Sequence, residues 1–223
     1  MTGTRSRVLI VDDHPIVRLG LTRLLSEEAD LVVCAEAGDA ASALAAVLQH
    51  EPHAAIVDIS LSGTSGLDLV RTMKRDRPEL AVLVVSMHDE ALYAERALRA
   101  GASGYVMKLE AMEVIIKALR RVLSGEIFLS DAMSGKLLKR FAQGGGDADH
   151  REGSPLASLS DREFEVLRLI GQGFGTREIA EILRISIKTV ESHRAHLKEK
   201  IRLGSGTELA RYAALWVEGE GHE

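Results

Sequence analysis

The chain has 223 residues, of which 46% are hydrophobic and 27% are charged, a composition that fits one large or two small globular domains. No apolar stretch approaches the roughly 20 residues that span a bilayer, and a single cysteine excludes an intramolecular disulfide framework, so we expect a soluble, cytoplasmic protein. Residues 1–158 hold 18 basic and 22 acidic side chains, whereas residues 159–217 hold 10 and 8, which predicts different partners for the two parts.

Five short apolar runs alternate with amphipathic segments in the first half of the chain. The runs are predicted to be strands, and they lie at 7–11, 31–36, 54–57, 81–85 and 104–107. Helical apolar spacing is found between and after them, at 16–25, 40–48, 67–73, 92–98 and 111–123. This pattern predicts a doubly wound α/β domain with a five-stranded parallel sheet and right-handed crossovers. Cys34 belongs to an apolar run and is expected to be a small core residue.

Polar side chains follow four of these strands at the points where the strands end: Asp12, Asp13, Asp58, Ser86 and Lys108. In a parallel sheet the carboxyl ends meet at one edge, where reactive groups collect. One such residue is usually a turn or helix cap, but five on four strands favour a shared site. Three carboxylates suit Mg²⁺, and Asp58 is then the candidate nucleophile for a phosphoryl group. Lys108 would neutralise a phosphoryl oxygen, and the Ser86 hydroxyl would donate to another.

The segment after the fifth predicted helix separates two differently patterned parts of the chain. Gly125 ends that helix, and residues 131–141 are predicted to form one more. Residues 144–153 are polar and rich in glycine, which is typical of a flexible tether. We therefore place a first domain at 5–125, a linker at 126–155 and a second domain at 156–218.

The second domain has a purely helical pattern, in which each predicted helix follows a capping residue. The predicted helices run from Ser160 to Ile170, Thr176 to Leu183, Ser186 to Ile201 and Ser205 to Val217. A short link, Arg184-Ile185, joins the second and third and predicts a helix-turn-helix. Gly171-Gln-Gly173-Phe-Gly175 superficially suggests a nucleotide-binding loop. It follows a helix and not a strand, so we interpret it as a helix end.

The helix predicted at 186–201 has one apolar face and one polar face. Val190, Leu197 and Ile201 form the inward stripe, which leaves the polar side chains available to a DNA groove. Glu191 has two interpretations, as an acceptor from a cytosine amino group or as a surface ion-pair partner of Arg194. The last helix has apolar residues expected partly to pack in the core and partly to serve a homodimer: Leu209, Tyr212, Ala213 and Trp216.

The motifs of the first half resemble the receiver domain of two-component response regulators over about residues 5–125. They are Val-Asp12-Asp13-His-Pro, Ile-Val-Asp58-Ile, Val-Val-Ser86 and Gly-Tyr105-Val-Met-Lys108. The resemblance implies a flavodoxin-like fold and the transfer of a phosphoryl group from a sensor histidine kinase to Asp58. It also implies direct Mg²⁺ binding by Asp13, Asp58 and the Ser60 backbone carbonyl, with Asp12 acting through water. Ser86 and Tyr105 match the family's switch pair.

The sequence departs from the family pattern beside two of these motifs. Leu61-Ser62 stand where the family commonly has Met-Pro, which loosens the loop but removes no ligand. Leu109 follows Lys108 where many receivers have proline, so no cis peptide bond is expected there. His14 is interpreted as a loop residue and not as a metal ligand, because the neighbouring groups are oxygen-rich and a proline follows it.

Residues 159–214 resemble the LuxR-type helix-turn-helix, and a receiver followed by this module resembles the NarL/FixJ family of response regulators. The resemblance implies binding to double-stranded promoter DNA and a homodimer when phosphorylated, with RNA polymerase as a further candidate partner. It places Glu191, Ser192 and Ala195 near base edges. Lys188, His193, Arg194 and Lys198 would lie nearer the DNA backbone, with Thr189 also at the interface.

The expected function is that of a DNA-binding transcriptional response regulator without separate substrate turnover. Two alternatives stay open at this point. One is a regulator that binds DNA without phosphorylation, which the complete acidic set disfavours. The other is a phosphatase or transferase with an aspartyl-phosphate nucleophile, which the lack of a substrate-covering domain disfavours.

Overall fold

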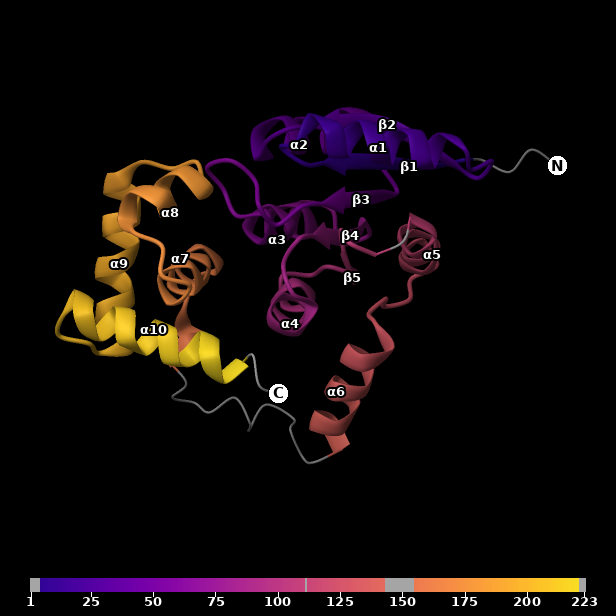
Figure 1. Cartoon of the computed structure of the whole chain (residues 1–223). Helices are drawn as coiled ribbons and strands as arrows, with labels where there is room; N and C mark the ends of the chain where they lie inside the picture. The colour runs from indigo at the N-terminus through magenta and orange to yellow at the C-terminus, as the bar shows by residue number, and fades with distance from the viewer. Residues whose placement is uncertain (1–4, 111, 143–154, 221–223) are drawn as a thin grey trace. The chain divides into compact units, whose positions relative to one another are not determined.

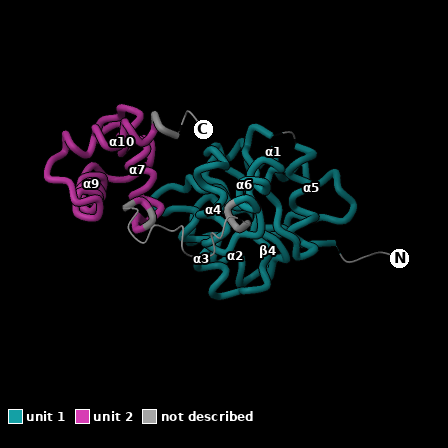
Figure 2. Tube along the Cα trace, turned by 90° about the horizontal axis from the view of Figure 1, so that it is seen from below, with its two compact units in different colours: residues 1–139 teal, residues 140–223 magenta. Residues whose placement is uncertain are grey.

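The chain forms two compact units, residues 1–139 and 140–223, in a computed structural model that describes residues 5–110, 112–142 and 155–220 (Figure 2). The division falls inside the segment predicted to be the linker. The predicted tether at 144–153 lies outside the described residues. Within them, no helix is both long enough and apolar enough to cross a membrane.

The first unit is built on a five-stranded parallel sheet with the strand order β2-β1-β3-β4-β5. The strands are β1 (Ser6–Val11), β2 (Leu31–Ala37), β3 (Ala54–Val57), β4 (Ala81–Ser86) and β5 (Gly104–Met107). All five predicted strands are present, and the predicted doubly wound α/β class is confirmed. The strand order reverses at β1, so the carboxyl ends of β1 and β3 form the position where such sheets bind ligands.

Helices cover both faces of the sheet, and Figure 1 shows α3 and α4 on the side opposite α5. They are α1 (Pro15–Ser26), α2 (Ala40–His50), α3 (Gly66–Asp76), α4 (Glu90–Arg99) and α5 (Met112–Leu123). Alternate residues of each strand point to one face, which is why Val8 and Ile10 pack with Leu25 of α1 and Leu119 of α5 in one buried cluster. The additional helix predicted near 131–141 is α6 (Asp131–Ala142).

Cys34 is half-buried, so its prediction as a core residue was wrong. β2 is an edge strand, and several of its residues are only partly covered. The thiol donates a hydrogen bond to the Val8 carbonyl at 3.4 Å, and burial raises the pKa of Cys34.

The second unit is helical and contains the predicted helix-turn-helix. Its elements are the 3₁₀ helix η1 (Pro155–Ser158), α7 (Asp161–Gly171), α8 (Thr176–Ile182), α9 (Ile187–Ile201) and α10 (Gly206–Glu220). Val166, Val190, Leu197 and Leu209 are fully buried in the core of this unit. The Phe164 ring meets Trp216 edge-on, with 5.2 Å between the ring centroids.

Three of the four predicted caps are confirmed and one was wrong. Ser160 and Glu163 form a full capping box, Ser186 accepts from the Thr189 backbone N–H, and Ser205 accepts from that of Glu208. The cap of α8 is Gly175 and not Thr176, because the Glu178 side chain accepts from the Gly175 N–H at 2.7 Å. This contact moves the start of α8 by one residue.

Candidate functional sites

The carboxyl edge of the sheet brings the predicted polar residues together. Asp12 and Asp58 are buried to 2% and 3% exposure at the ends of β1 and β3. Lys108 follows β5, and its Nζ atom lies 2.5 Å from Asp12 Oδ2 and 2.7 Å from Asp58 Oδ2. Ligand atoms of Asp12, Asp13, His14 and Asp58 all lie within 4.8 Å of one another. Residues that lie far apart in the sequence, each at the end of a strand, therefore form one site.

Asp12, Asp13 and Asp58 bring three carboxylates to this site, and Lys108 brings one ammonium group. Burial raises the pKa of Asp58, and the charge of Lys108 opposes that effect. Burial by itself would lower the pKa of Lys108, but Asp58 and Asp12 raise it overall. Among the described residues, the buried Asp58 Oδ1 atom has no hydrogen-bond partner. A buried carboxylate oxygen without a donor favours a bound cation or an electrophile at that point.

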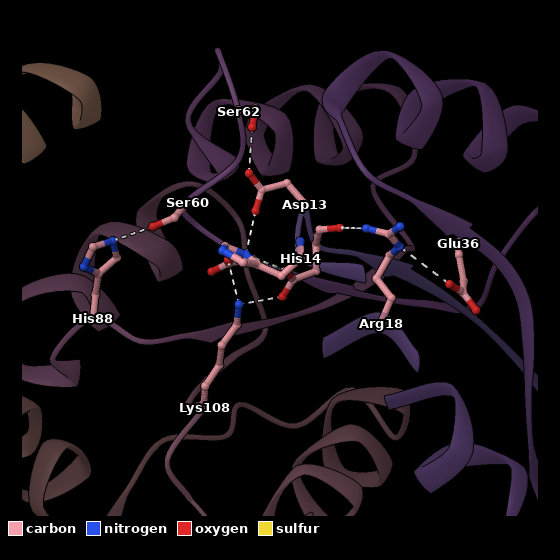
Figure 3. Close-up of polar contacts among 10 residues, drawn as sticks. Asp13, His14, Arg18, Glu36, Ser60, Ser62, His88 and Lys108 are labelled. Atoms are coloured by element: carbon pink, nitrogen blue, oxygen red, sulfur yellow. Dashed lines mark hydrogen bonds and ion pairs between the residues drawn. The ribbon is translucent and has the colours of Figure 1, made fainter. Parts of the chain in front are cut away.

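His14 lies closer to the acidic residues than a simple loop residue would. It is the N-cap residue of α1, and its Nδ1 atom lies 2.7 Å from Asp13 Oδ1 and 3.3 Å from Asp12 Oδ1. Its side chain is about half exposed. The arrangement makes His14 a partner of the Asp13 carboxylate, as Figure 3 shows.

The loop after β3 contributes two hydroxyl groups whose contacts were not predicted. Ser60 Oγ lies 2.8 Å from His88 Nε2, and Ser62 Oγ donates to Asp13 Oδ2 at 2.7 Å (Figure 3). A close turn holds this loop, since the Gly66 N–H donates to the Ile59 carbonyl at 2.7 Å. The loop is therefore tied both to the loop after β1 and to the loop after β4.

Arg18 holds the backbone of the acidic loop and was also missed. Its Nη1 atom donates to the Asp12 carbonyl at 2.6 Å, and its Nε atom lies 3.6 Å from Glu36 Oε2 (Figure 3). Thr22 donates to the other Glu36 oxygen at 2.7 Å. The sequence signal was a basic residue on α1 and an acidic one on β2, which is too common a pattern to single out.

The predicted switch pair is buried and connected through His88. Ser86 and Tyr105 are 0% and 1% exposed. The Tyr105 hydroxyl donates to the His88 carbonyl at 2.8 Å, and the His88 N–H donates to Ser86 Oγ at 3.3 Å. The His88 ring stacks on Tyr93 with 4.5 Å between the centroids. Burial raises the pKa of Tyr105 well above its ordinary value, so its hydroxyl stays protonated as a donor.

Large apolar side chains are exposed on the same edge of the sheet. Ile16 is 84% exposed and Leu109 is 73% exposed, although both are apolar. Similar side chains occur nearby on α1, after β4 and at the start of α5: Leu19, Met87 and Met112. Exposed apolar residues grouped around a polar site are typical of a surface that meets another protein.

In the second unit, α9 presents the predicted polar face to solvent. Val190, Leu197 and Ile201 are buried, as predicted. The residues predicted to contact DNA include five exposed ones, Lys188, Thr189, Glu191, Ser192 and Ala195, and three half-buried ones, His193, Arg194 and Lys198. Within the described part of the chain, Glu191 forms no ion pair with Arg194, which leaves its carboxylate available.

Two residues of this face also have contacts inside the unit. The Thr189 hydroxyl lies 2.7 Å from Ser186 Oγ and belongs to the cap of α9. Burial and the nearby charge of Arg162 lower the pKa of His193. His193 is therefore a weaker candidate for a charged phosphate contact than Lys188 or Arg194.

Charged side chains of α7 connect this helix to α8 and α9. Arg162 Nη1 lies 2.6 Å from Glu165 Oε2, and its Nη2 atom donates to the Leu183 carbonyl at 3.1 Å, at the end of α8. Glu163 accepts from Lys200 of α9 at 2.7 Å. In the sequence, charged residues stand among the apolar ones of α7. The predicted capping box accounts for Glu163 but not for the contacts of Arg162 with Glu165 and Leu183.

Two family models match the two units. The receiver-domain model of response regulators matches residues 8–120, and the model of bacterial regulatory proteins of the luxR family matches residues 157–213. The chain is 36% identical over 208 residues to the oxygen regulatory protein NreC of Staphylococcus carnosus, covering 93% of this chain and 96% of the relative. NreC of Staphylococcus epidermidis is 37% identical over 209 residues.

Solved structures of similar proteins span both units. RcsB from Salmonella enterica serovar Typhimurium, bound to the promoter rprA in the presence of phosphomimetic BeF₃⁻, is 31% identical. It covers 95% of this chain and 99% of its own, with a TM-score of 0.58. Another structure of the Salmonella typhimurium RcsB response regulator is 28% identical, with a TM-score of 0.63 and coverage of 95% and 98%.

Proposed function

Because the chain belongs to the NarL/FixJ type of two-component response regulators, which join a receiver domain to a LuxR-type helix-turn-helix domain, we propose that phosphorylation of Asp58 controls its binding to promoter DNA. Members of this family are DNA-binding transcription regulators and not enzymes. The observation that carries the proposal is the buried Asp58 carboxylate, whose Oδ1 atom has no hydrogen-bond partner among the described residues and whose Oδ2 atom contacts Lys108. We propose domain limits of 5–125 and 156–218 with a linker at 126–155.

Phosphoryl transfer at this site needs a nucleophile and a counter-charge. An Asp58 carboxylate oxygen attacks the phosphorus of a phosphohistidine, the P–N bond breaks, and its electron pair stays on the histidine nitrogen. Lys108 already contacts Asp58, so its ammonium group is placed to neutralise a phosphoryl oxygen. Asp12 contacts the same ammonium group, with 2.5 Å between Asp12 Oδ2 and Lys108 Nζ.

Mg²⁺ is the cofactor that fits this set of donors. Three carboxylates and a backbone carbonyl are the hard oxygen ligands that this ion prefers. We assign Asp13, Asp58 and the Ser60 carbonyl as its direct ligands and Asp12 as a partner through water. When bound, Mg²⁺ neutralises phosphoryl oxygens and so favours attack by the carboxylate. Lys108 would then be shared between Asp12 and the phosphoryl group.

The contacts of His88 suggest how phosphorylation is transmitted. When the Ser86 hydroxyl turns to donate to a phosphoryl oxygen, the hydrogen bond from the His88 N–H to Ser86 is lost. The His88 carbonyl is the acceptor for Tyr105, so a shift of His88 changes the anchor of the buried ring. Ser86 and Tyr105 thus act as a coupled pair through the backbone of His88.

A sensor histidine kinase is the proposed phosphodonor. The exposed apolar residues after β1 and β5, Ile16 and Leu109, lie on the edge of the sheet that carries Asp58. They offer a surface to a protein donor, which must bring its phosphohistidine to a buried carboxylate. The proposed place of action is the cytoplasm, where promoter DNA and RNA polymerase are found.

A homodimer is the proposed DNA-binding form. A pocket of about 500 Å³ lies between α1 and α5 and has Leu24 and Ile116 in its lining. Its lining also includes Glu27, directly after α1, and Arg121 of α5. Because this lining combines apolar side chains with charges of both signs, a second copy related by a two-fold axis can meet it with the same set of groups. A dimer matches the two-fold symmetry of many promoter sites.

The proposed function is tested by measuring DNA affinity with and without a phosphodonor. Duplex fragments are first selected from genomic DNA by the full-length protein, and their affinity is then measured by fluorescence anisotropy. Acetyl phosphate with Mg²⁺ is expected to raise the affinity at least tenfold, and sedimentation is expected to show dimers at the same concentration. Unchanged affinity and mass, despite complete phosphorylation, would refute the proposal.

Replacing Lys188 by Ala is expected to weaken binding to all duplexes by a similar factor. Each phosphate contact adds about 0.9 to the slope of log K against log salt, so the slope should fall by about 0.9 for each bound protomer. Lys136→Ala, which removes the same charge from an exposed position on α6, serves as the control. An unchanged slope for the Lys188 variant would remove Lys188 from the interface.

A further inference from the structure

The Asp13 carboxylate is held by side chains on both of its oxygens. Ser62 donates to Oδ2 at 2.7 Å, and His14 Nδ1 lies 2.7 Å from Oδ1 (Figure 3). Oδ1 is buried, and a carboxylate oxygen of Asp13 lies within 4.8 Å of ligand atoms of Asp12 and Asp58. Ser62 therefore holds one carboxylate oxygen of Asp13 and His14 holds the other, so that the orientation of the whole carboxylate is fixed before a cation binds.

The loop after β3 has a defined conformation, and this conformation positions the Ser62 hydroxyl. Leu61 is buried to 2% exposure, and Ser60 pairs with Ser65 in an isolated antiparallel bridge on the two sides of Ser62. Gly63 has a φ of 80°, a left-handed conformation that glycine adopts without strain and that closes the turn. Little loop entropy is lost when Ser62 bonds to Asp13, because the packing of the loop has already fixed its position.

Residue 62 is also a point where this chain departs from its family. Receiver domains commonly have proline here, and proline has no side-chain donor. The serine adds a donor to a carboxylate that the proposed function uses as a metal ligand. Donors that orient a ligating carboxylate raise metal affinity, because the ligand no longer has to be ordered when the ion binds.

We propose that Ser62 is a positioning residue that fixes the Asp13 carboxylate and thereby strengthens Mg²⁺ binding in this particular chain. The inference rests on the proposed function, since it requires that Asp13 binds the ion. Ser62 touches neither the ion nor the phosphoryl group in this proposal. Its effect is on the affinity for Mg²⁺ and not on the rate of phosphoryl transfer once the ion is bound.

The test is the Mg²⁺ affinity of the full-length protein, measured by calorimetry with MgCl₂ and no phosphodonor. Ser62→Ala is expected to raise the dissociation constant for Mg²⁺ about tenfold, the lower limit of the roughly 10- to 100-fold range for partners that orient metal ligands. Ser62→Thr keeps the hydroxyl and is expected to bind Mg²⁺ like the wild type. Thr64→Ala removes an exposed hydroxyl from the same loop and serves as the matched control.

A second measurement separates positioning from a general loss of structure. The initial rate of phosphorylation by acetyl phosphate is measured against Mg²⁺ concentration. Ser62→Ala should need more Mg²⁺ for half-maximal rate but reach the wild-type rate at saturation. An affinity equal to the wild type would overturn the inference, and so would a lower rate at saturating Mg²⁺.

The same titrations distinguish this inference from the proposed function. If the wild type binds Mg²⁺ and Asp13→Asn does not, while Ser62→Ala matches the wild type, only the role of Ser62 is refuted. If the wild type itself binds no Mg²⁺, the proposed metal site fails and the role of Ser62 fails with it.

Discussion

Replacing Asp58 by Asn is expected to abolish phosphoryl incorporation from acetyl phosphate and Mg²⁺, with a loss on the order of 100-fold or more. The amide keeps the shape of the carboxylate but is a far weaker nucleophile, and it removes a charge from the proposed metal site. Lys108 loses one of its two contacts and keeps Asp12 as a partner. The label is measured by intact mass or on a gel that retards phosphoproteins.

Folding should survive this substitution. Burial raises the pKa of Asp58, which means that its ionised form is disfavoured inside the protein. A neutral amide at this position is therefore expected to leave the midpoint of urea unfolding unchanged or to raise it. Asp68→Asn is the matched control, because Asp68 is an exposed residue of α3 whose carboxylate pairs with Arg71 at the surface.

The Asp58→Asn variant also distinguishes a regulator that depends on phosphorylation from one that binds DNA without it. In the proposed mechanism its DNA affinity stays at the value of the unphosphorylated protein and no longer responds to the phosphodonor. A variant that gains label at the wild-type rate would show that another residue is the acceptor. A variant whose DNA affinity equals that of the phosphorylated wild type would favour a regulator that does not depend on phosphorylation.

Gly66→Ala is expected to lower the free energy of unfolding by about 3 kcal/mol or more, which is the largest effect on stability among the variants proposed. Gly66 is the first residue of α3, and a Cβ atom on it would lie 1.9 Å from the Asp58 carbonyl oxygen and 2.7 Å from the Ile59 Cα. Both are backbone atoms, so no side-chain rotation relieves the contact. The backbone after β3 must move, and the Asp58 carboxylate and the Ser60 carbonyl move with it.

The stability of this variant is measured by hydrogen exchange of the sheet and by urea unfolding of the full chain. Gly20→Ala is the control, because Gly20 lies inside α1 and a Cβ atom there would meet nothing within 4 Å. Alanine is favoured over glycine in a helix, so this control should stabilise the first unit by about 0.5 to 1 kcal/mol. Equal stability of the Gly66 variant and the wild type would contradict the close approach seen at Asp58.

Local sequence patterns predicted most of the fold. The five strands were predictable because buried parallel strands are continuous apolar runs, and the helices between them because one apolar stripe recurs with helical spacing. The helices of the second unit were predictable from their caps. The two errors of detail have local causes: Gly175 caps α8 because the Glu178 side chain reaches back to it, and Cys34 is half-buried because β2 is an edge strand.

The sequence by itself determined that Asp12, Asp13, Asp58, Ser86 and Lys108 lie at one edge of the sheet, because the parallel topology brings the strand ends together whatever path the loops follow. Only the tertiary structure decided how those residues are held. Ser62 and Asp13 are 49 residues apart and Tyr105 and His88 are 17 apart, and each contact depends on the course of irregular loops that no periodicity encodes. Strand ends are placed by repeated backbone geometry, whereas single side-chain contacts between loops are placed by packing. The position of Asp58 at the carboxyl edge was therefore predictable, and the contact between Ser62 and Asp13 was not.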